Sequence, residues 1–279
     1  MLPRVVVLAV ATLALPLPVS ADLKPLWEAG IGPVGLYLPD YRGSNQSRGY
    51  VYPFPYVVYR GDFFKIDRWG IRTLFLDTDR VEFDISGYGT PPVDSSKNTA
   101  RQGMPDLNPT VEVGPALNII LARDRRIDYT YRFDLRLPVR AAIATDLKSW
   151  QGIGFTFYPN LSLDLRPELF GRRWNAAVQA GVLYGSRKYN EYFYSVPLQF
   201  ATPTRPPYAA PGGYSGAVFV ASFSRRFDKV WVGGYIRYDN LSGAVFDPSP
   251  LVLRNSAIGG GIAIAWVFAE SDRKVEADD

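Results

Sequence analysis

The sequence predicts an all-β protein, a single closed antiparallel transmembrane β-barrel of about twelve strands, with ten strands as the alternative. Apolar and polar residues alternate with a period of two along most of the chain. Several of these runs exceed about ten residues, which is longer than an ordinary strand and enough to cross a bilayer. Aromatic residues make up 14% of the 279 residues, and Gly (25) and Pro (23) exceed their usual shares of ~7% and ~5%. This composition favours a turn-rich β protein over a helical one.

The first 21 residues have the pattern of a secretory signal peptide. Arg4 supplies a positive charge, 5–17 are apolar, and Val19-Ser20-Ala21 has the small residues of a cleavage site. This apolar stretch is too short to span ~30 Å of hydrocarbon as a helix. We therefore expect residues 1–21 to be removed after export, 22–268 to form the barrel, and 269–279 to form an acidic C-terminal tail.

The clearest transmembrane pattern lies in 127–139. Every second residue from Ile127 to Val139 is apolar or aromatic, and most of the residues between them are charged or polar. A soluble periplasmic sandwich also alternates, but long strands edged by aromatic residues favour a barrel with a polar lumen. The predicted strands are 26–37, 50–60, 62–67, 70–76, 81–88, 110–121, 127–139, 150–165, 174–186, 214–224, 230–240 and 257–268.

Loop lengths predict which end of the barrel faces which side. Bacterial barrels have an even number of strands, short periplasmic turns and longer outer loops. With twelve strands, every short turn falls at one end and every long connection at the other. Treating 62–76 as one strand leads to the ten-strand alternative. The short turns are 60–62, 77–80, 122–126, 166–173 and 225–229, and the long connections are 38–49, 89–109, 140–149, 187–213 and 241–256.

The composition excludes several kinds of chemistry. The chain has no His and no Cys, which excludes a Ser-His-Asp triad, a Cys nucleophile, the usual structural zinc sites and disulfides. No nucleotide-binding loop follows a strand and opens a helix. The net charge of +4 comes from bases interleaved with acids, which argues against nucleic acid as a partner. We therefore expect a protein that is not an enzyme and that has no catalytic residues, no metal and no cofactor.

Charged residues predicted on the inward face carry both signs. Glu82 and Asp84 lie two residues apart on one strand, so both side chains point to the same face. Two carboxylates can act as acid and base, but the nearby cations favour an ion-pair network that satisfies a polar interior and tends to plug the lumen. The predicted network comprises Glu82, Asp84, Glu112, Asp128, Arg132, Asp134, Arg136, Asp164, Arg237 and Asp239.

Two long connections, 89–109 and 187–213, are the candidate interaction loops. Loops of about 20 residues are usually functional or disordered. In the first loop, Met104 and Leu107 beside Asp106 predict a recognition turn or a segment that folds into the barrel mouth, with a solvated loop as the alternative. The second is rich in Tyr, which suits an interface or a membrane-boundary belt. The candidate contact residues are Arg101, Met104, Asp106, Leu107, Tyr192, Tyr194, Arg205 and Tyr208.

A series of short motifs resembles the MipA/OmpV family of MltA-interacting outer-membrane proteins. The motifs occur in the expected order over most of the chain, from about 30 to 268. They are 39–44 (PDYRGS), 52–56 (YPFPY), 101–107 (RQGMPDL), 134–140 (DLRLPVR), 210–214 (APGGY), 237–246 (RYDNLSGAVF), 249–252 (SPLV) and 266–268 (WVF). The tail after Phe268 departs from the family, whose members often stop near that point.

The resemblance implies a non-enzymatic scaffold in the bacterial outer membrane. Such a protein contacts outer-membrane lipid and bridges a lytic transglycosylase and a penicillin-binding murein synthase, and the family offers no catalytic residues to transfer. Two other functions stay open at this stage. The charged inner face suits a small pore or transporter, and loops 89–109 and 187–213 suit a surface adhesin.

Overall fold

The computed structural model describes residues 23–61, 64–67, 70–73, 76–78, 80–125, 130–146 and 148–276. The predicted signal peptide lies outside these residues and stays a prediction. In the described part of the chain, no helix is long and apolar enough to cross a membrane.

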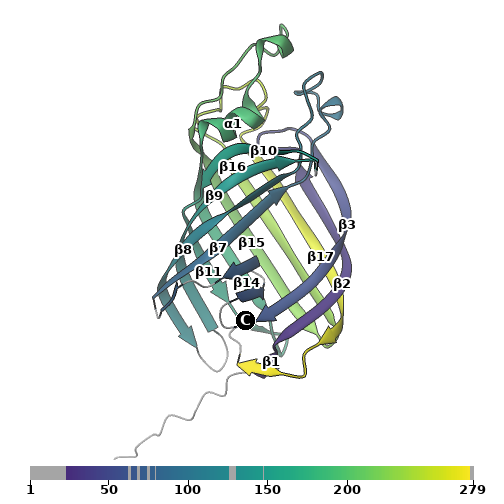
Figure 1. Cartoon of the computed structure of the whole chain (residues 1–279), viewed down its shortest axis with the longest axis vertical. Helices are drawn as coiled ribbons and strands as arrows, with labels where there is room; N and C mark the ends of the chain where they lie inside the picture. Colours follow the sequence, from purple (N-terminus) through teal and green to yellow (C-terminus); the bar gives the residue numbers. More distant parts are fainter. Residues whose placement is uncertain are drawn as a thin grey trace, which may run out of the picture.

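Ten long strand segments form the wall of the molecule, and each one pairs antiparallel with its neighbours (Figure 1). The strand β10 (Trp150–Phe157) continues as β11 (Asn160–Leu165), and both pair with β9 and β14. Pro159 separates them, because proline cannot donate to a strand ladder. The other long strands are β2 (Trp27–Pro39), β3 (Ser47–Arg60), β7 (Val81–Thr90), β8 (Thr110–Arg125), β9 (Thr130–Thr145), β14 (Asn175–Gly185), β15 (Gly213–Phe227), β16 (Val230–Asn240) and β17 (Ser256–Glu270).

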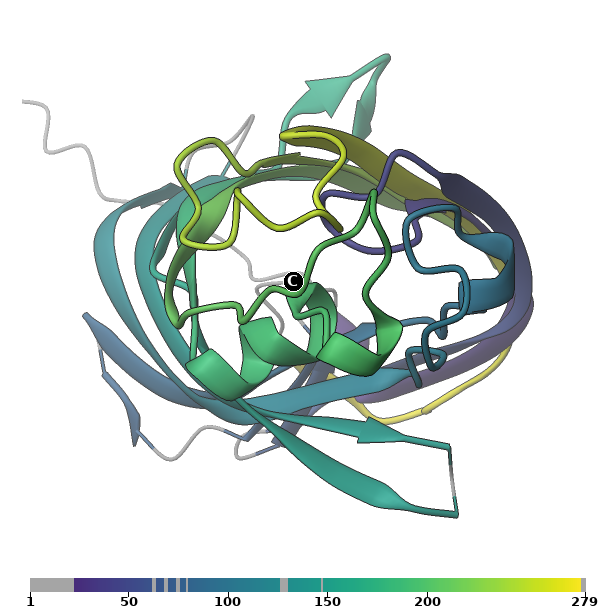
Figure 2. The ribbon, with the colours of Figure 1, turned by 90° about the horizontal axis from the view of Figure 1, so that it is seen from above.

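The sheet curls until its two ends meet. The strand order runs β5-β4-β3-β2-β17-β16-β15-β14-β10-β9-β8-β7-β6. Here β4 (Phe64–Asp67), β5 (Gly70–Thr73) and β6 (Leu76–Asp77) are short, and β5 lies against β7. Seen from above, the strands form a ring (Figure 2). The prediction of a single antiparallel β-barrel is therefore confirmed, and each of the twelve predicted ranges overlaps a strand.

Proline marks the edge at which the sheet ends meet. In the described residues, β3 pairs with β4 only through Tyr59 and Arg60. Pro53 of β3 stands opposite Pro33 of β2. Two prolines cannot exchange hydrogen bonds, so this is a non-hydrogen-bonded pair, and the nitrogens of Pro53 and Pro55 both point away from β2. The free edge of β3 therefore lacks two donors, which suits an edge strand.

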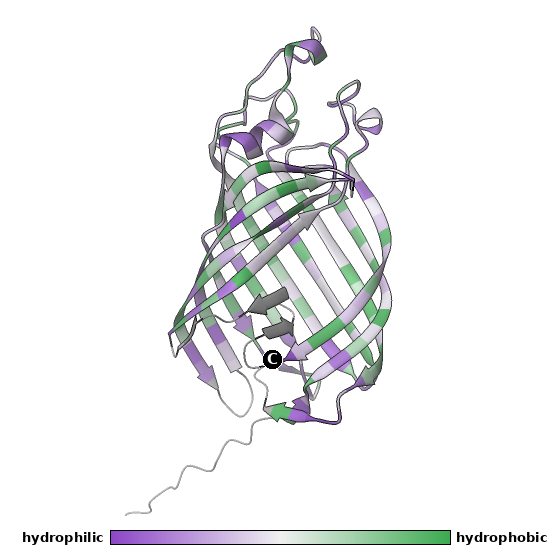
Figure 3. Ribbon diagram, in the orientation of Figure 1, coloured by the Kyte–Doolittle hydropathy of each residue, from purple (hydrophilic) through white to green (hydrophobic). Residues whose placement is uncertain are grey.

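The barrel has a loop end and a turn end. The long connections gather at the top of Figure 1, and both termini of the described chain lie at the bottom. Bands of apolar and polar residues alternate along the strands (Figure 3). Large apolar side chains are exposed on the outer face, including Ile236, Ile258, Ile262, Ile264 and Trp266. An apolar face turned outward fits a barrel wall surrounded by lipid.

Two predicted short turns, 122–126 and 225–229, and one predicted long connection, 140–149, are shorter than expected. β9 continues to Thr145 rather than ending at 139, β8 continues to Arg125, and β15 continues to Phe227. Residues 141–145 read Ala-Ala-Ile-Ala-Thr, so the small side chains hide the period of two. Pairing with β8 and β10 extends the strand there. The prediction of a long connection over 140–149 was therefore wrong for residues 140–145, which belong to β9.

Part of the predicted C-terminal tail forms β-strands. β17 runs to Glu270, and the short strand β18 (Lys274–Glu276) pairs with β1 (Leu23–Pro25) near the N-terminus. The Arg60 guanidinium donates a hydrogen bond to the Pro25 carbonyl oxygen at 2.7 Å. Backbone pairing therefore joins the two ends of the described chain at the turn end of the barrel.

Close contact between β2 and β17 leads to a first prediction. A Cβ added at Gly32 would collide with the Ile264 carbonyl oxygen and lie within 3 Å of the Ala265 Cα. We expect Gly32→Ala to lower the free energy of unfolding by about 1–3 kcal/mol, because backbone cannot move as easily as a side chain. Urea titration of the lipid-reconstituted barrel measures this. Gly152→Ala is the control, since a Cβ there meets no atom within 4 Å. Equal unfolding midpoints for the two variants would contradict this account.

Candidate functional site

The loop end is closed by a cap of four loops, residues 40–46, 91–109, 186–212 and 241–255. The third loop contains the helix α1 (Arg187–Tyr194) and the turn η2 (Leu198–Phe200), and the second contains η1 (Ser95–Lys97). In Figure 2, α1 and the loops lie across the mouth of the ring. The helix was not predicted, although its buried residues Tyr189, Asn190, Phe193 and Tyr194 have helical spacing and Ser186 caps its first turn.

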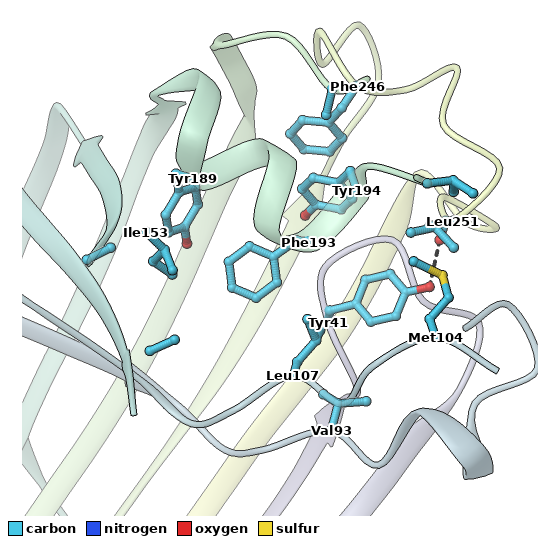
Figure 4. Packing of buried hydrophobic residues seen from close by; sticks show 14 of the residues in the cluster. Tyr41, Val93, Met104, Leu107, Ile153, Tyr189, Phe193, Tyr194, Phe246 and Leu251 are labelled. Carbon is cyan, nitrogen blue, oxygen red and sulfur yellow. Dashed lines mark hydrogen bonds between the residues drawn. The ribbon is translucent and has the colours of Figure 1, made fainter. Parts of the chain in front are cut away.

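The cap has its own hydrophobic core. Figure 4 shows apolar and aromatic side chains from different loops pointing toward one another. Tyr194 of α1 stacks on Phe246 of the last loop, with ring centroids 3.7 Å apart. The Tyr41 hydroxyl donates to the Leu251 carbonyl oxygen at 2.7 Å. Burial raises the pKa of the Tyr41 hydroxyl, so it stays protonated as a donor. The cap is therefore a packed unit rather than a set of solvated loops.

Five of the eight candidate contact residues are buried in this cap: Arg101, Met104, Leu107, Tyr194 and Arg205. Arg101 donates to the Phe193 carbonyl oxygen at 3.2 Å and to the Pro105 carbonyl oxygen at 3.1 Å, which ties the 91–109 loop to α1. Burial lowers the pKa of the Arg101 guanidinium, which remains charged because arginine titrates far above neutral pH.

The other candidates also make contacts within the cap. Arg205 donates to the carbonyl oxygens of Ala100 and Gln102, at 2.8 and 3.0 Å. An Asp106 carboxylate oxygen accepts from the Ser95 amide at 2.7 Å. The Tyr192 hydroxyl accepts from the Asn108 amide at 2.8 Å, and the Tyr208 hydroxyl lies 3.4 Å from the Val245 carbonyl oxygen. Most of these residues thus contact another cap loop or pack in the cap core, whereas Asp106 bonds within its own loop. Of the alternatives predicted for Met104 and Leu107, the structure shows a segment folded into the barrel mouth.

The predicted lumen network separates into two groups of ion pairs. In the first group, Arg132 bonds Glu82 at 2.7 Å and Asp134 at 2.7 Å. Asp164 lies opposite Arg132 in the ladder between β9 and β11. In the second group, Asp239 accepts from both Arg237 and Arg42, each at 2.7 Å. Sequence reasoning missed Arg42, because it follows β2 by three residues and meets β16 only in three dimensions.

The remaining network members bond neutral groups. Asp84 accepts from Asn118 at 2.8 Å, and Arg136 donates to the same amide at 3.1 Å. Glu112 accepts from Thr156 at 2.8 Å and from the Tyr189 hydroxyl of α1 at 2.9 Å, so it links the wall to the cap. Asp128 lies outside the described residues. These contacts therefore link β7, β8, β9 and β10 along the wall and, through Tyr189, the wall to the cap.

A further charged cluster, which lies at the turn end, was not predicted from the sequence. Glu28 is buried and pairs with Arg60 at 2.8 Å and with Arg226 at 2.5 Å. The Tyr56 hydroxyl also donates to Glu28, at 3.0 Å. Three strands, β2, β3 and β15, supply these residues, so no local motif marks them. The cluster fixes the strand ends near the chain termini.

A small hairpin projects from the turn end between β11 and β14. It consists of β12 (Glu168–Leu169) and β13 (Arg172–Arg173), with Phe170 and Gly171 at its tip. Both tip residues have positive φ, 56° and 65°, which is the pattern of a type I′ turn. Phe170 is 96% exposed and Leu169 is 49% exposed. A bulky residue with positive φ is uncommon, and such strain often accompanies function.

The curled antiparallel sheet, its apolar outer face and its polar lumen define an outer-membrane β-barrel protein. The model of the family described as "MltA-interacting protein MipA" matches residues 31–268. The chain therefore belongs to the MipA family, and the resemblance seen in its motifs is confirmed.

Comparison with curated proteins finds no match. Among solved structures, the chain is similar to a FadL homologue of Pseudomonas aeruginosa, with a TM-score of 0.31 and 9% identity over 87% of this chain and 90% of that chain. It is also similar to the toluene transporter TbuX of Ralstonia pickettii, with a TM-score of 0.24 and 11% identity over 89% of this chain and 70% of that chain. Scores this low carry no argument about the function of this chain.

Proposed function

We propose that this chain is a non-enzymatic adaptor of the outer membrane that binds a lytic transglycosylase at its turn end and brings it to a penicillin-binding murein synthase. The family description, which names an MltA-interacting protein, supports the first partner. The second partner, the penicillin-binding synthase, is proposed from the resemblance of the sequence motifs to the MipA/OmpV family. The absence of His and Cys from the sequence supports a role without catalysis.

The exposed tip of the β12–β13 hairpin is the observation that carries this proposal. Short turns of bacterial barrels face the periplasm, where murein enzymes act. Phe170 places a nearly fully exposed aromatic ring there, with Arg172 and Arg173 directly beyond it. Aromatic residues and Arg are enriched among the residues that contribute most to protein interfaces. A partner that covered this ring would remove a large apolar surface from water.

The base of the hairpin is held in place. Arg225 of β15 stacks on Trp174 and Phe227, with its guanidinium carbon 5.4 and 4.7 Å from the ring centroids. The Trp174 amide donates to the Pro167 carbonyl oxygen at 2.9 Å. The hairpin therefore presents Phe170 on a braced base, which lowers the entropy cost of binding.

Phe170→Asn tests the contact without weakening the fold. Asn-Gly is the preferred pair for a type I′ turn, so we expect the variant barrel to be as stable as the wild type or more so. Capture of lytic transglycosylase from detergent-extracted envelopes, quantified by mass spectrometry, should fall about tenfold or more, as expected when an interface loses an aromatic anchor. Leu198→Asn is the matched control, because Leu198 is 79% exposed on the cap at the opposite end.

Three outcomes would count against this proposal, the first two against the hairpin as the contact and the third against the adaptor role. Undiminished capture by Phe170→Asn would remove the hairpin as the contact. Equal loss with Leu198→Asn would show that capture follows general surface apolarity. An empty capture from well-folded wild-type protein, together with discrete conductance in planar bilayers, would favour the pore instead. The packed cap over the barrel mouth supports a silent barrel.

A further inference from the structure

A chamber of about 360 Å³ lies inside the barrel beneath the cap. Its roof includes Leu107 from the second cap loop and Phe193 and Tyr194 from α1. Its walls include residues of β2, β7, β8, β9, β11, β14, β15, β16 and β17. Ligand pockets usually have volumes of ~300–1,000 Å³, so the chamber is large enough for a small organic molecule. None of the adaptor contacts proposed above lies in it.

One side of the chamber carries a cation without a carboxylate partner. Arg140 of β9 lines the chamber and donates from Nε and Nη2 to the Ser86 hydroxyl, at 3.0 and 2.7 Å. Within the described residues it forms no ion pair, in contrast to Arg42 and Arg237, which share Asp239. The Glu112 carboxylate is near enough to act on Arg140 electrostatically, but it is bonded to Thr156 and Tyr189. The half-buried Arg140 guanidinium bonds only the Ser86 hydroxyl among the described residues, so it retains donors and a charge that suit an anion.

Three further polar atoms of chamber-lining residues lack partners. Two of them are donors, and the third, Asn160 Oδ1, is an acceptor. The Tyr158 hydroxyl and the Arg42 Nη2 are buried, and neither has a hydrogen-bond partner in the described part of the chain. Both residues line the chamber. Buried polar groups are nearly always hydrogen-bonded, so an unpaired hydroxyl and an unpaired guanidinium nitrogen need an explanation. Both can donate, as Arg140 can, and an acceptor with negative charge would satisfy all three.

Another part of the chamber lining is apolar. Leu183 of β14, with Val218 and Val220 of β15, faces it, and Tyr88 and Tyr235 add aromatic surface. Tyr88 is held in place because its hydroxyl accepts from Arg237 at 3.0 Å and its ring lies 5.2 Å from the Arg237 guanidinium carbon. The chamber lining thus combines hydrogen-bond donors with hydrocarbon and ring surface, and it also includes the Glu112 and Asp239 carboxylates, which are bonded within the protein.

We propose that this chamber is a binding site for a small amphipathic carboxylate, with its carboxylate at Arg140 and Tyr158 and its apolar body against β14 and β15. Arg binds carboxylates through two parallel hydrogen bonds, which explains why an unpaired guanidinium would be kept here. The apolar wall distinguishes such a ligand from an inorganic anion. The site is independent of the hairpin at the turn end.

Isothermal titration of the full-length barrel in nanodiscs tests the proposal. The probes are 2-naphthoate, the neutral analogue 2-naphthalenemethanol, and inorganic phosphate, with empty nanodiscs as the blank. We expect saturable naphthoate binding with one site per barrel. Arg140→Gln should weaken naphthoate binding about tenfold or more and leave the alcohol within about twofold, because only the charge-assisted bonds are lost. Tyr158→Phe should weaken naphthoate binding by a smaller factor.

Arg254→Gln is the matched control. It removes the same charge from an exposed position on the cap, so naphthoate affinity should stay unchanged. Heat-modifiable migration on gels shows that each variant is folded. The proposal is overturned if folded wild-type barrel binds no naphthoate above the blank, or if Arg140→Gln binds it as tightly as the wild type. It is equally overturned if the alcohol or phosphate alone binds as tightly as naphthoate.

Discussion

Asp239→Asn is expected to lower the free energy of unfolding by about 3–5 kcal/mol, the usual cost of removing one partner from a buried ion pair. The Asp239 carboxylate accepts from Arg237 Nε and Nη2 at 2.7 and 2.8 Å and from Arg42 Nε at 2.7 Å. Asparagine keeps the shape but not the charge. Two guanidinium groups would then lie together inside the barrel with no anion between them.

Urea unfolding in lipid vesicles, followed by tryptophan fluorescence, measures this effect. Asp272→Asn is the control, because Asp272 is exposed in the C-terminal segment, and we expect no measurable change there. A midpoint for Asp239→Asn that equals the wild type would show that water or ions satisfy the two arginines without Asp239. The substitution should also loosen the cap from the wall, since Arg42 belongs to the first cap loop and Asp239 to β16.

Phe246→Ala is expected to open the cap while leaving the barrel wall folded. Phe246 is fully buried and stacks on Tyr194 at 3.7 Å. Replacing a buried Phe with Ala costs about 3–5 kcal/mol. That cost falls on the local equilibrium between closed and open cap, so amide hydrogen exchange in 187–200 and 241–252 should speed up by roughly 10²–10³-fold.

This variant has two controls, which are amide exchange in the barrel wall and a substitution at an exposed position of the cap. Amides in β8 and β9 should exchange as in the wild type, because their ladder does not depend on Phe246. Leu198→Ala should leave cap exchange unchanged, since Leu198 is 79% exposed. Unchanged exchange in Phe246→Ala would mean that the cap does not depend on its aromatic core. Faster exchange throughout the wall would mean that cap and barrel unfold together.

The two ends of the barrel therefore have separable proposed roles, ligand binding beneath the cap and partner binding at the hairpin. Phe246→Ala alters the cap and its roof over the chamber, and it leaves the hairpin at Phe170 intact. Capture of a transglycosylase by this variant should match the wild type, whereas naphthoate binding should weaken because the roof of the chamber includes Phe193 and Tyr194.

Sequence alone determined the barrel and the order of its strands. Alternation with a period of two is a local property, and a closed antiparallel sheet is the arrangement that satisfies the backbone of such strands in lipid. Strand ends were less certain where small residues obscure the alternation, as in Ala141 to Thr145 of β9. The ordered motifs from about 30 to 268 also indicated the family, which matches 31–268.

Only the tertiary structure decided what the candidate residues do. Arginine is a residue type that is enriched in protein interfaces. The hydrogen bonds of Arg101 and Arg205, however, join loops of the same chain. Arg42 meets Asp239 from 197 positions away, and the Arg140 side chain faces a chamber whose lining comes from nine strands. Residue type sets which bonds a side chain can form, whereas burial and distant partners set which bonds it does form. A local stretch of sequence does not show which distant residues those partners are. The cap, the chamber and the hairpin could therefore be described only from the folded barrel.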